Sequence, residues 1–533
     1  QDPNVLYAAG NVVFRTTNDG ERWQVVSGDL TRNDKTKQGP SGGPITKDNT
    51  SVEYYGTIFA LAPSPHDSGT IWAGSDDGLV HVTRDGGRTW ANVTPRDLPE
   101  WSLISIIEVS PHDPATAYVA ATRYKLDDFR PYVFRTNDYG RSWRRITTGI
   151  PPTHFIRVVR EDPARRGLLY AGGEFGVYVS FDDGTSWQSL QRNLPVAPVH
   201  DLAVRDHDLV AATHGRSFWV LDDLTPLHQL SAEVVRRERH LFGPRDVWRL
   251  QGGGGFGGRA PGVGQNPPNG AVVRFYLRAL PDSEVRLEFL DAQDSLIRAF
   301  SSRPAVPSDS LRVEAGVNRF VWNLRHADAS RFPGMILWGG GTQGPVALPG
   351  RYRVRLTVGG WSETREFAVL KDPRVTATDA DLRQQFDLLR AIRDRVTAAN
   401  DAVRRIREVR EEVTASAARA RRVGGEAGRA IARAADSLNV QLTVVEEAIY
   451  QTKNRSSQDP LNYPIRLNNK LAALTNVVGD ADARPTEQAR QLFAELSAAL
   501  QVELDRLQAV LDTGVPAFNR LVKDQDVPAI ILR

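Results

Sequence analysis

The octapeptide Thr83-Arg84-Asp85-Gly86-Gly87-Arg88-Thr89-Trp90 decides the fold, because the chain contains it in four variants. The other three are Thr16-Thr17-Asn18-Asp19-Gly20-Glu21-Arg22-Trp23, Thr136-Asn137-Asp138-Tyr139-Gly140-Arg141-Ser142-Trp143 and Ser180-Phe181-Asp182-Asp183-Gly184-Thr185-Ser186-Trp187. All share the pattern Ser/Thr-x-Asp-x-Gly-x-Ser/Thr-Trp, which we call the Asp box, and only Asn18 and Arg22 depart from it. Repetition of this kind is typical of a fold assembled from like supersecondary units.

The residue types of the Asp box suit a tight turn followed by a buried indole. An Asp carboxylate accepts backbone N–H bonds across a short loop, Gly adopts positive φ without strain, and Trp offers a large ring for packing between sheets. We therefore assign structural and not catalytic roles to the box residues Asn18, Trp23, Asp85, Trp90, Asp138, Trp143, Asp182 and Trp187.

Alternating strands flank each box, which predicts that the box joins the third and fourth strands of a four-stranded unit. Upstream, Ile58–Ala62 and Thr70–Gly74 are joined by a polar turn, and the same arrangement recurs over 106–120. Four antiparallel strands make one blade of a β-propeller, and about five blades fit residues 1–235. The first unit lacks its first strand. The sequence thus predicts an incomplete ring, with a missing N-terminal propeller segment as partner, from the same protein or a separate chain.

Two further regions follow the propeller. Residues 236–270 are rich in Gly and Pro and are predicted to be a connector, because no Lys-Ser/Thr follows the Gly run as a phosphate-binding loop requires. Short alternating strands over 271–370 predict an immunoglobulin-like β-sandwich, with Trp322 in its core.

The hydrophobic period changes from 2 to 3.6 after Thr378, which together with Asp381 matches a capping box. Breaks at 424–425, 456–464 and 480–485 predict three or four antiparallel helices in a bundle over 376–525. The predicted fold is therefore mainly β with a C-terminal α domain.

Composition bounds the function classes. A length of 533 residues implies about three or four domains, and a net charge of +3 argues against a nucleic-acid partner. The absence of Cys excludes disulfides and thiolate chemistry. No apolar run is long enough for a membrane span, and no cofactor is expected.

Several stretches outside the boxes resemble one family. They are Gly42-Gly43-Pro44-Ile45-Thr46, Glu53-Tyr54-Tyr55-Gly56-Thr57-Ile58, Glu174-Phe175-Gly176-Val177-Tyr178-Val179-Ser180 and Ala212-Thr213-His214-Gly215-Arg216-Ser217-Phe218-Trp219. They are similar to large bacterial proteins related to the sortilin-type propeller and often labelled BNR-repeat glycosyl hydrolases. The resemblance implies a secreted, periplasmic or cell-surface protein of which this chain is the C-terminal half. The label itself establishes no catalytic mechanism.

Blade geometry predicts where a ligand binds. Turns between second and third strands share a face with the connections between blades, opposite the Asp boxes, and propellers as a class bind on that face. The candidate binding residues there are Glu53, Tyr54, Tyr55, Arg123, Tyr124, Asp127, His214 and Arg216. Aromatic rings with charges of both signs suit a peptide, protein or glycan. The alternative is that these are ordinary turn residues and inter-blade ion pairs.

A hydrolase is the competing hypothesis. An inverting glycosidase needs two carboxylates about 6.5–9.5 Å apart, which Asp76 or Asp77 facing Asp128 or Glu174 would supply. No His, Asp and Glu residues have metal-ligand spacing. We therefore predict a non-catalytic binding or assembly scaffold, with glycoside hydrolysis as the alternative. A structural subunit of a cell-surface assembly is a third possibility, for which large apolar patches on the helical bundle would be the sign.

Overall fold

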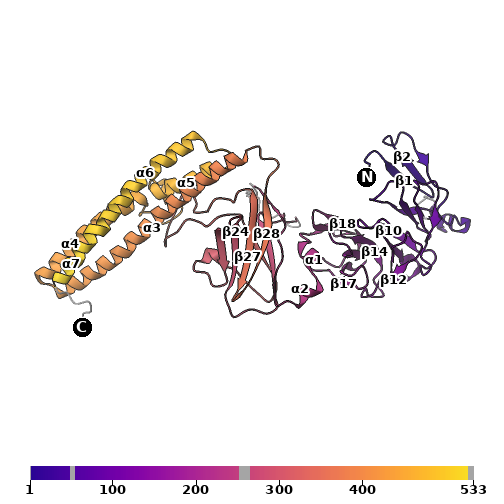
Figure 1. Ribbon diagram of the computed structural model, residues 1–533, viewed down its shortest axis with the longest axis horizontal. Helices are drawn as coiled ribbons and strands as arrows, with labels where there is room; N and C mark the ends of the chain where they lie inside the picture. Colours follow the sequence, from indigo (N-terminus) through magenta and orange to yellow (C-terminus); the bar gives the residue numbers. More distant parts are fainter. Residues whose placement is uncertain (1, 49–53, 251–263, 526–533) are drawn as a thin grey trace. The chain divides into compact units, whose positions relative to one another are not determined.

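Five antiparallel sheets of three or four strands succeed one another in the first part of the computed structural model, which describes residues 2–48, 54–250 and 264–525 (Figure 1). The chain divides into two compact units, Gln1–Leu230 and Ser231–Arg533. The first unit contains the five sheets, and the second contains two more sheets and the long helices.

We number the five sheets as blades 1 to 5 in chain order. Blade 1 is β1 (Leu6–Ala9), β2 (Val13–Thr16) and β3 (Gln24–Val25). Blade 2 is β6 (Ile58–Pro63), β7 (Ile71–Ser75), β8 (Val80–Thr83) and β9 (Ala91–Asn92). Blade 3 is β10 (Leu103–Val109), β11 (Ala117–Arg123), β12 (Asp128–Thr136) and β13 (Arg144–Arg145). Blade 4 is β14 (Ile156–Glu161), β15 (Leu169–Gly173), β16 (Gly176–Ser180) and β17 (Gln188–Ser189), and blade 5 is β18 (Val199–Arg205), β19 (Asp208–Thr213) and β20 (Phe218–Leu221).

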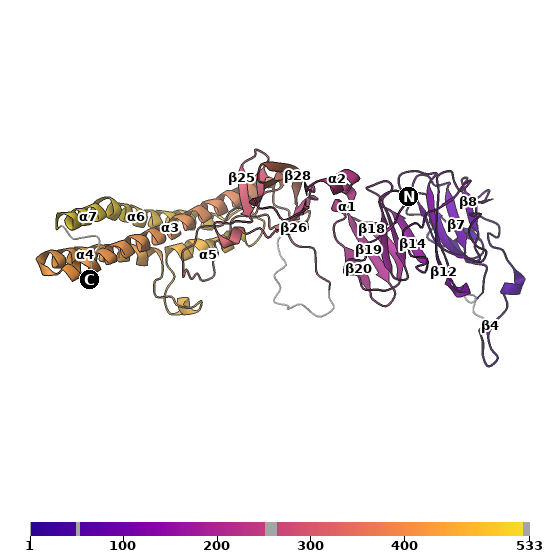
Figure 2. The same ribbon diagram turned by 90° about the horizontal axis from the view of Figure 1, so that it is seen from below.

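Short elements lie between the strands and between the blades. Between blades 1 and 2 lie the 3-10 turn η1 (Lys35–Lys37) and a hairpin of β4 (Ser41–Gly42) and β5 (Lys47–Asp48), labelled at β4 in Figure 2. The 3-10 turn η2 (Tyr124–Leu126) joins β11 to β12, and the helix α1 (Thr225–Gln229) follows blade 5.

Each Asp box is the hairpin between the last two strands of its blade, as predicted. In blade 2, Oδ1 of Asp85 accepts the Thr89 backbone N–H at 2.9 Å, and Oδ2 accepts the Thr89 hydroxyl at 2.7 Å. The Thr83 hydroxyl donates to Asp85 and accepts the N–H of Gly87. These hydrogen bonds lower the pKa of Asp85 to about 2, because they stabilise the ionised form. The Asp85 carboxylate thus holds the turn closed through these hydrogen bonds.

The box tryptophans link consecutive blades. In blades 2, 3 and 4 the indole Nε1 donates to a carbonyl just after the last strand of the preceding blade. The three bonds are Trp90 to Val26 at 2.9 Å, Trp143 to Val93 at 2.6 Å and Trp187 to Ile146 at 2.8 Å. The same residues approach the box glycines: a Cβ on Gly87 would lie 2.4 Å from the Val26 oxygen. Trp and Gly of each box are therefore interlocked with the blade before them.

Blade 1 is the exception among the four boxes. The Trp23 side chain is 45% exposed, and its Nε1 donates to no residue that the structure describes. A Cβ on Gly20 would meet nothing closer than the Trp23 ring at 3.8 Å. The surface of blade 1 that corresponds to the inter-blade contact of blades 2 to 4 is thus uncovered in this chain.

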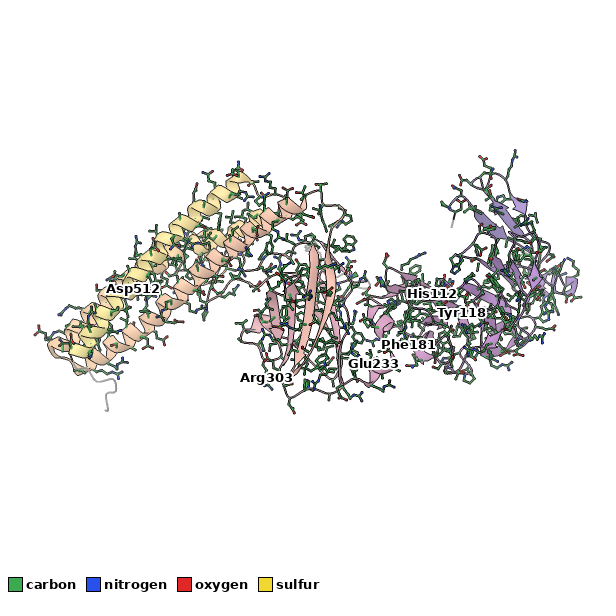
Figure 3. The ribbon with its side chains drawn as sticks, in the orientation of Figure 1. His112, Tyr118, Phe181, Glu233, Arg303 and Asp512 are labelled. Carbon is green, nitrogen blue, oxygen red and sulfur yellow. The ribbon has the colours of Figure 1, made fainter. Side chains whose placement is uncertain are left out.

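A repeated turn provides a second link between blades. The Ser-Pro-His-Asp turns between first and second strands place His66 and His112 at equivalent positions in blades 2 and 3. Nε2 of His66 donates to the Ser110 carbonyl at 2.9 Å, and Nε2 of His112 donates to the Asp162 carbonyl at 2.8 Å. Figure 3 labels His112, in the turn after β10, and Tyr118, in β11. Each histidine therefore bonds to the following blade.

The apolar cores of the first unit lie between the sheets. One core takes Trp72 and Val82 from blade 2 with Ile104 and Phe134 from blade 3, and the next takes Tyr118 from blade 3 with Leu169 from blade 4. Similar clusters join blades 1 to 2 and 4 to 5. Consecutive sheets therefore pack face to face, as in a propeller.

The second unit begins with α2 (Ala232–Arg236) and two sheets around one core. A three-stranded sheet contains β21 (Arg239–Leu241), β23 (Ala271–Leu277) and β26 (Gly316–Trp322). A five-stranded sheet contains β22 (Val247–Arg249), β28 (Trp361–Lys371), β27 (Gly350–Val358), β24 (Val285–Asp291) and β25 (Leu296–Ser301), and η3 (Pro307–Asp309) follows β25. Trp322 is fully buried and stacks on Phe289 at 4.5 Å, which places it in the core.

Part of the predicted connector is regular structure. Within 236–270, β21 pairs with β23, and β22 pairs in parallel with β28 more than a hundred residues later. These segments are three residues long, too short for an alternating pattern to identify them. The Gly run at 252–258 lies outside the described residues.

The helical part follows the predicted breaks. Its helices are α3 (Asp379–Val423), α4 (Gly425–Ile449), α5 (Leu467–Gly479), α6 (Glu487–Ala509) and α7 (Val515–Asp524), with η4 (Asp459–Leu461) before α5 and a π turn (Val510–Gly514) between α6 and α7. The capping box of Thr378 and Asp381 starts α3 as predicted. These helices share one core, and Figure 1 shows the long helices side by side. No helix in the described part of the chain has the length and apolar composition to cross a bilayer.

Candidate binding site

A pocket of about 400 Å³ opens between blades 2 and 3, at the end opposite the Asp boxes. Aromatic rings dominate its wall, and three charged residues accompany them. The lining residues are Tyr54, Tyr55, Thr57, Phe59, Asp76, Trp101, Leu103, Thr122, Arg123, Tyr124, Lys125 and Leu126. A volume of this size and an apolar lining with few polar groups are typical of ligand sites.

Strand direction brings the four lining segments together. The chain enters β6 just after Tyr55 and enters β10 just after Trp101, while Asp76 lies in the β7–β8 turn and Tyr124 follows β11. Because neighbouring strands alternate in direction, all four points lie at one end of their blades. A hydrogen bond holds the β7–β8 turn against the segment before β6: the Asp76 N–H donates to the Thr57 carbonyl at 2.9 Å.

Asp76 is the acid of this pocket. Its Oδ1 accepts the backbone N–H groups of Gly56 and Thr57, each at 2.9 Å, whereas its Oδ2 receives no hydrogen bond from any residue that the structure describes. Burial, and to a smaller degree the neighbouring Asp77 carboxylate, raise the pKa of Asp76 although the two backbone bonds act against them. The pocket therefore holds a half-buried carboxylate whose Oδ2 has no hydrogen-bond partner among the described residues.

The aromatic wall is held by ring contacts within the pocket and beside it. The rings of Tyr55 and Trp101 lie 5.1 Å apart and are tilted, and Tyr124 stacks on Phe155 at 5.0 Å. Such ring pairs add to the stabilisation from burial. The wall is thus preorganised before a ligand enters.

Trp101 and Phe59 were missed by the sequence analysis. Trp101 has a positive φ of 61°, a conformation that residue type alone does not signal. One signal was present: Tyr55, Trp101 and Phe155 each stand just before the first strand of a blade. An aromatic residue at a recurrent position of a repeat would have predicted this wall.

Two of the four acids proposed for hydrolysis are tied to the scaffold around the pocket. Asp77 is 1% exposed and accepts the Ser75 hydroxyl at 2.5 Å and the Arg32 backbone N–H at 2.7 Å. Asp128 is buried and accepts bonds from Arg130 and Tyr132 at 2.7 Å each. Neither residue lines the pocket.

Glu174 and the remaining binding candidates lie elsewhere on the first unit. Glu174 pairs with Arg157 at 2.7 Å in blade 4. Asp127 ends η2 with a left-handed backbone, the His214 ring lies 5.1 Å from that of His200, and Arg216 is exposed. Glu53 lies outside the described residues.

Of the predicted binding and catalytic candidates, the pocket therefore unites Tyr54, Tyr55, Asp76, Arg123 and Tyr124. Among the residues that the structure describes, no group of three or more His, Asp or Glu side chains is placed to hold a metal ion.

Comparison with known proteins gives one sequence match and several distant structural likenesses. No protein-family model matches the sequence. The chain is 31% identical over 105 residues to vacuolar protein sorting/targeting protein 10 of Laccaria bicolor, a match that covers 19% of this chain and 6% of that protein. The chain thus spans only a small part of this relative's length.

Among solved structures, YCF48 from Cyanidioschyzon merolae is 19% identical with a TM-score of 0.24, covering 31% of this chain and 53% of its own. PorZ of Porphyromonas gingivalis is 14% identical with a TM-score of 0.31, covering 69% and 50%. The xyloglucanase of Xanthomonas campestris is 11% identical with a TM-score of 0.31, covering 70% and 67%. These scores are low, so identification depends on the sequence match and on the repeated blades. By its Asp boxes, its interlocked blades and its match to the sorting protein, the chain is similar to the sortilin-like Asp-box (BNR-repeat) β-propeller proteins.

Proposed function

We propose that the chain is a non-catalytic binding scaffold, secreted, periplasmic or on the surface of a bacterial cell, and that its ligand site is the pocket between blades 2 and 3. The observation that carries this proposal is the combination of an aromatic wall with a single carboxylate. Preorganised aromatic rings with a few placed polar groups favour recognition of a peptide, a protein segment or a glycan. One solved YCF48 structure is described as bound to a D1 peptide, which agrees with peptide as a ligand class.

The carboxylate arrangement favours binding over glycoside hydrolysis. Hydrolysis needs an acid and a second carboxylate across one substrate, and Asp76 is the only carboxylate among the described residues of the pocket lining. Asp77, Asp128 and Glu174 are each engaged by partners of the scaffold. Turnover of a xyloglucan oligosaccharide by the purified chain, abolished in an Asp76→Asn variant, would overturn the proposal.

Replacing Trp101 with alanine is expected to weaken ligand binding by about 30-fold, since a central aromatic anchor typically contributes 2 kcal/mol or more. The intact chain is screened against a random peptide library and a glycan array, and the affinity of each ligand found is measured for the variant. Trp248→Ala, which removes an exposed indole of the second unit, is the matched control. Ligands that bind both variants like the parent would place the site elsewhere.

We also propose that the uncovered surface of blade 1 receives a further propeller segment, from the same protein or a separate chain. The support is the exposed Trp23 and the open space around Gly20, where the equivalent residues of three later boxes meet a preceding blade.

If so, residues 1–533 by themselves are expected to associate or precipitate through this surface. Replacing Trp23 and Val25 with serine should raise the soluble monomeric fraction several-fold, because both side chains are exposed. Light scattering measures the monomeric fraction. The control is Leu280→Ser, which replaces an exposed leucine of the second unit with the same polar residue. A parent chain that is already a well-behaved monomer would contradict the proposal.

For the second unit we propose an immunoglobulin-like sandwich over 271–370, to which the predicted connector over 236–270 adds the strands β21 and β22, and a helical bundle over 376–525. A propeller region over 1–235 precedes them. The shared core of the two sheets supports the sandwich. We assign neither region the primary ligand site.

A further inference from the structure

The acids around the pocket differ in their charge partners. Asp128 pairs with Arg130 at 2.7 Å, Glu174 with Arg157 at 2.7 Å, and Glu100 with Arg32 at 3.3 Å. Asp76 forms no ion pair with any described residue, and its free Oδ2 is the exception among these carboxylates. A carboxylate removed from water without a cation is unfavourable, so this position is suited to receive one.

The aromatic wall has the complementary property. Within the chain itself, the guanidinium of Arg32 lies 5.4 Å from the Trp101 ring centroid, and the Lys37 ammonium lies 6.0 Å from it. Arg157 lies 5.1 Å from the Tyr124 centroid. The faces of these rings attract cations, and indole and phenol rings from three chain segments surround the same cavity as Asp76.

The cations in the lining do not occupy this position. Nε of Arg123 donates to the Glu100 carbonyl at 3.1 Å, and its Nη1 lies 3.5 Å from Asp128. Lys125 is exposed. An anionic ligand at the base of the pocket would meet the Asp76 carboxylate, with Asp77 behind it, and would be repelled.

We propose that the pocket binds one cationic side chain of a peptide, arginine in preference to lysine, with its charge on Asp76 Oδ2 and its flat face against the aromatic wall. Arginine is preferred because a planar guanidinium both stacks on rings and donates to a carboxylate. This inference rests on the proposed binding function and specifies its ligand. The cavity of about 400 Å³ accommodates a single side chain with its flanking backbone.

The affinity of the pocket for a cation is expected to depend on pH, because only the ionised Asp76 carboxylate attracts a cation. Burial raises the pKa of Asp76, and a bound cation favours the ionised form, so affinity for the cation is present above that pKa and is lost as the pH falls through it. The charged and titratable groups around Asp76 are Asp77 of the same turn, Tyr55 before β6, and Arg123 and Lys125 of the pocket lining, with Arg32 bonded to the Asp77 backbone carbonyl. Burial and the Asp76 charge raise the pKa of Tyr55, so Tyr55 stays neutral over this range.

The test compares two peptides that differ in one charge. Acetyl-Gly-Gly-Arg-Gly-Gly-amide and its citrulline counterpart have nearly the same shape, and calorimetric titration of the intact chain gives both affinities. We expect the arginine peptide to bind at least about tenfold more tightly. Asp76→Asn should abolish that preference while leaving the citrulline peptide unchanged, and Trp101→Ala should weaken both.

Other outcomes separate this inference from the proposed function. Equal affinity for the two peptides, with both weakened by Trp101→Ala, would overturn the cation preference and leave the pocket as a peptide site. Binding of a xyloglucan heptasaccharide, but of neither peptide, would overturn it in favour of a glycan. If neither peptide binds at millimolar concentration, the cation inference fails, and the Trp101-dependence of library ligands independently decides the proposed function.

Discussion

Replacing Trp187 with alanine is expected to lower the free energy of unfolding of the first unit by about 3–5 kcal/mol, the range for deleting a large buried ring. The Trp187 ring is 3% exposed between blades 3 and 4, and its Nε1 donates to the Ile146 carbonyl at 2.8 Å. The variant loses the buried apolar area and leaves a carbonyl without its donor. Urea unfolding of the intact chain, with the transition of the first unit followed by near-ultraviolet circular dichroism, measures the change.

Trp23→Ala is the matched control, because it removes the same residue type from the same position of the same motif. Its ring is 45% exposed and has no preceding blade in this chain, so we expect a loss below about 1 kcal/mol, as at surface positions in general. Equal losses in the two variants would mean that these indoles stabilise their own hairpins and not the contact between blades.

The sequence predicts the blades well because the determinants of an Asp box are local. The donors that bond the Asp85 carboxylate lie within seven residues, Thr83 to Thr89. A short pattern of residue types is therefore enough to predict the hairpin. The three-residue strand β22 was missed for the opposite reason, since its partner β28 lies more than a hundred residues away.

The pocket could be predicted in part. Alternating strand direction brings Tyr55, Asp76 and Tyr124 to one end of the blades, and it needs only the order of the strands. The order of the strands does not predict which side chains or backbone groups bond to each acid. Asp76 and Asp77 are neighbours in sequence, yet one lines the cavity and the other is enclosed with Ser75 and Arg32. Arg32 lies 45 residues from Asp77 along the chain, so the sequence pattern around the two acids does not show this contact.

Replacing Glu446 with alanine is expected to lower the free energy of unfolding of the second unit by about 1.5–3 kcal/mol, the range for losing hydrogen bonds between charged groups, because the two arginines left behind are partly exposed. Glu446 of α4 is 3% exposed and accepts bonds from two guanidinium groups of α3, Arg407 at 2.8 Å and Arg410 at 2.5 Å. Without the carboxylate, two like charges remain side by side at the α3–α4 contact.

The adjacent Glu447 provides the control, because its side chain is exposed on the same turn of α4. Glu447→Ala should change the unfolding free energy by no more than about 0.5 kcal/mol, as measured by thermal unfolding of the helices at 222 nm. Glu446→Gln keeps the shape and removes the charge, so it should lie closer to Glu446→Ala than to the parent if the two arginines cause the loss. Should Glu446→Gln instead match the parent, packing of the side chain and not its charge would hold α3 against α4.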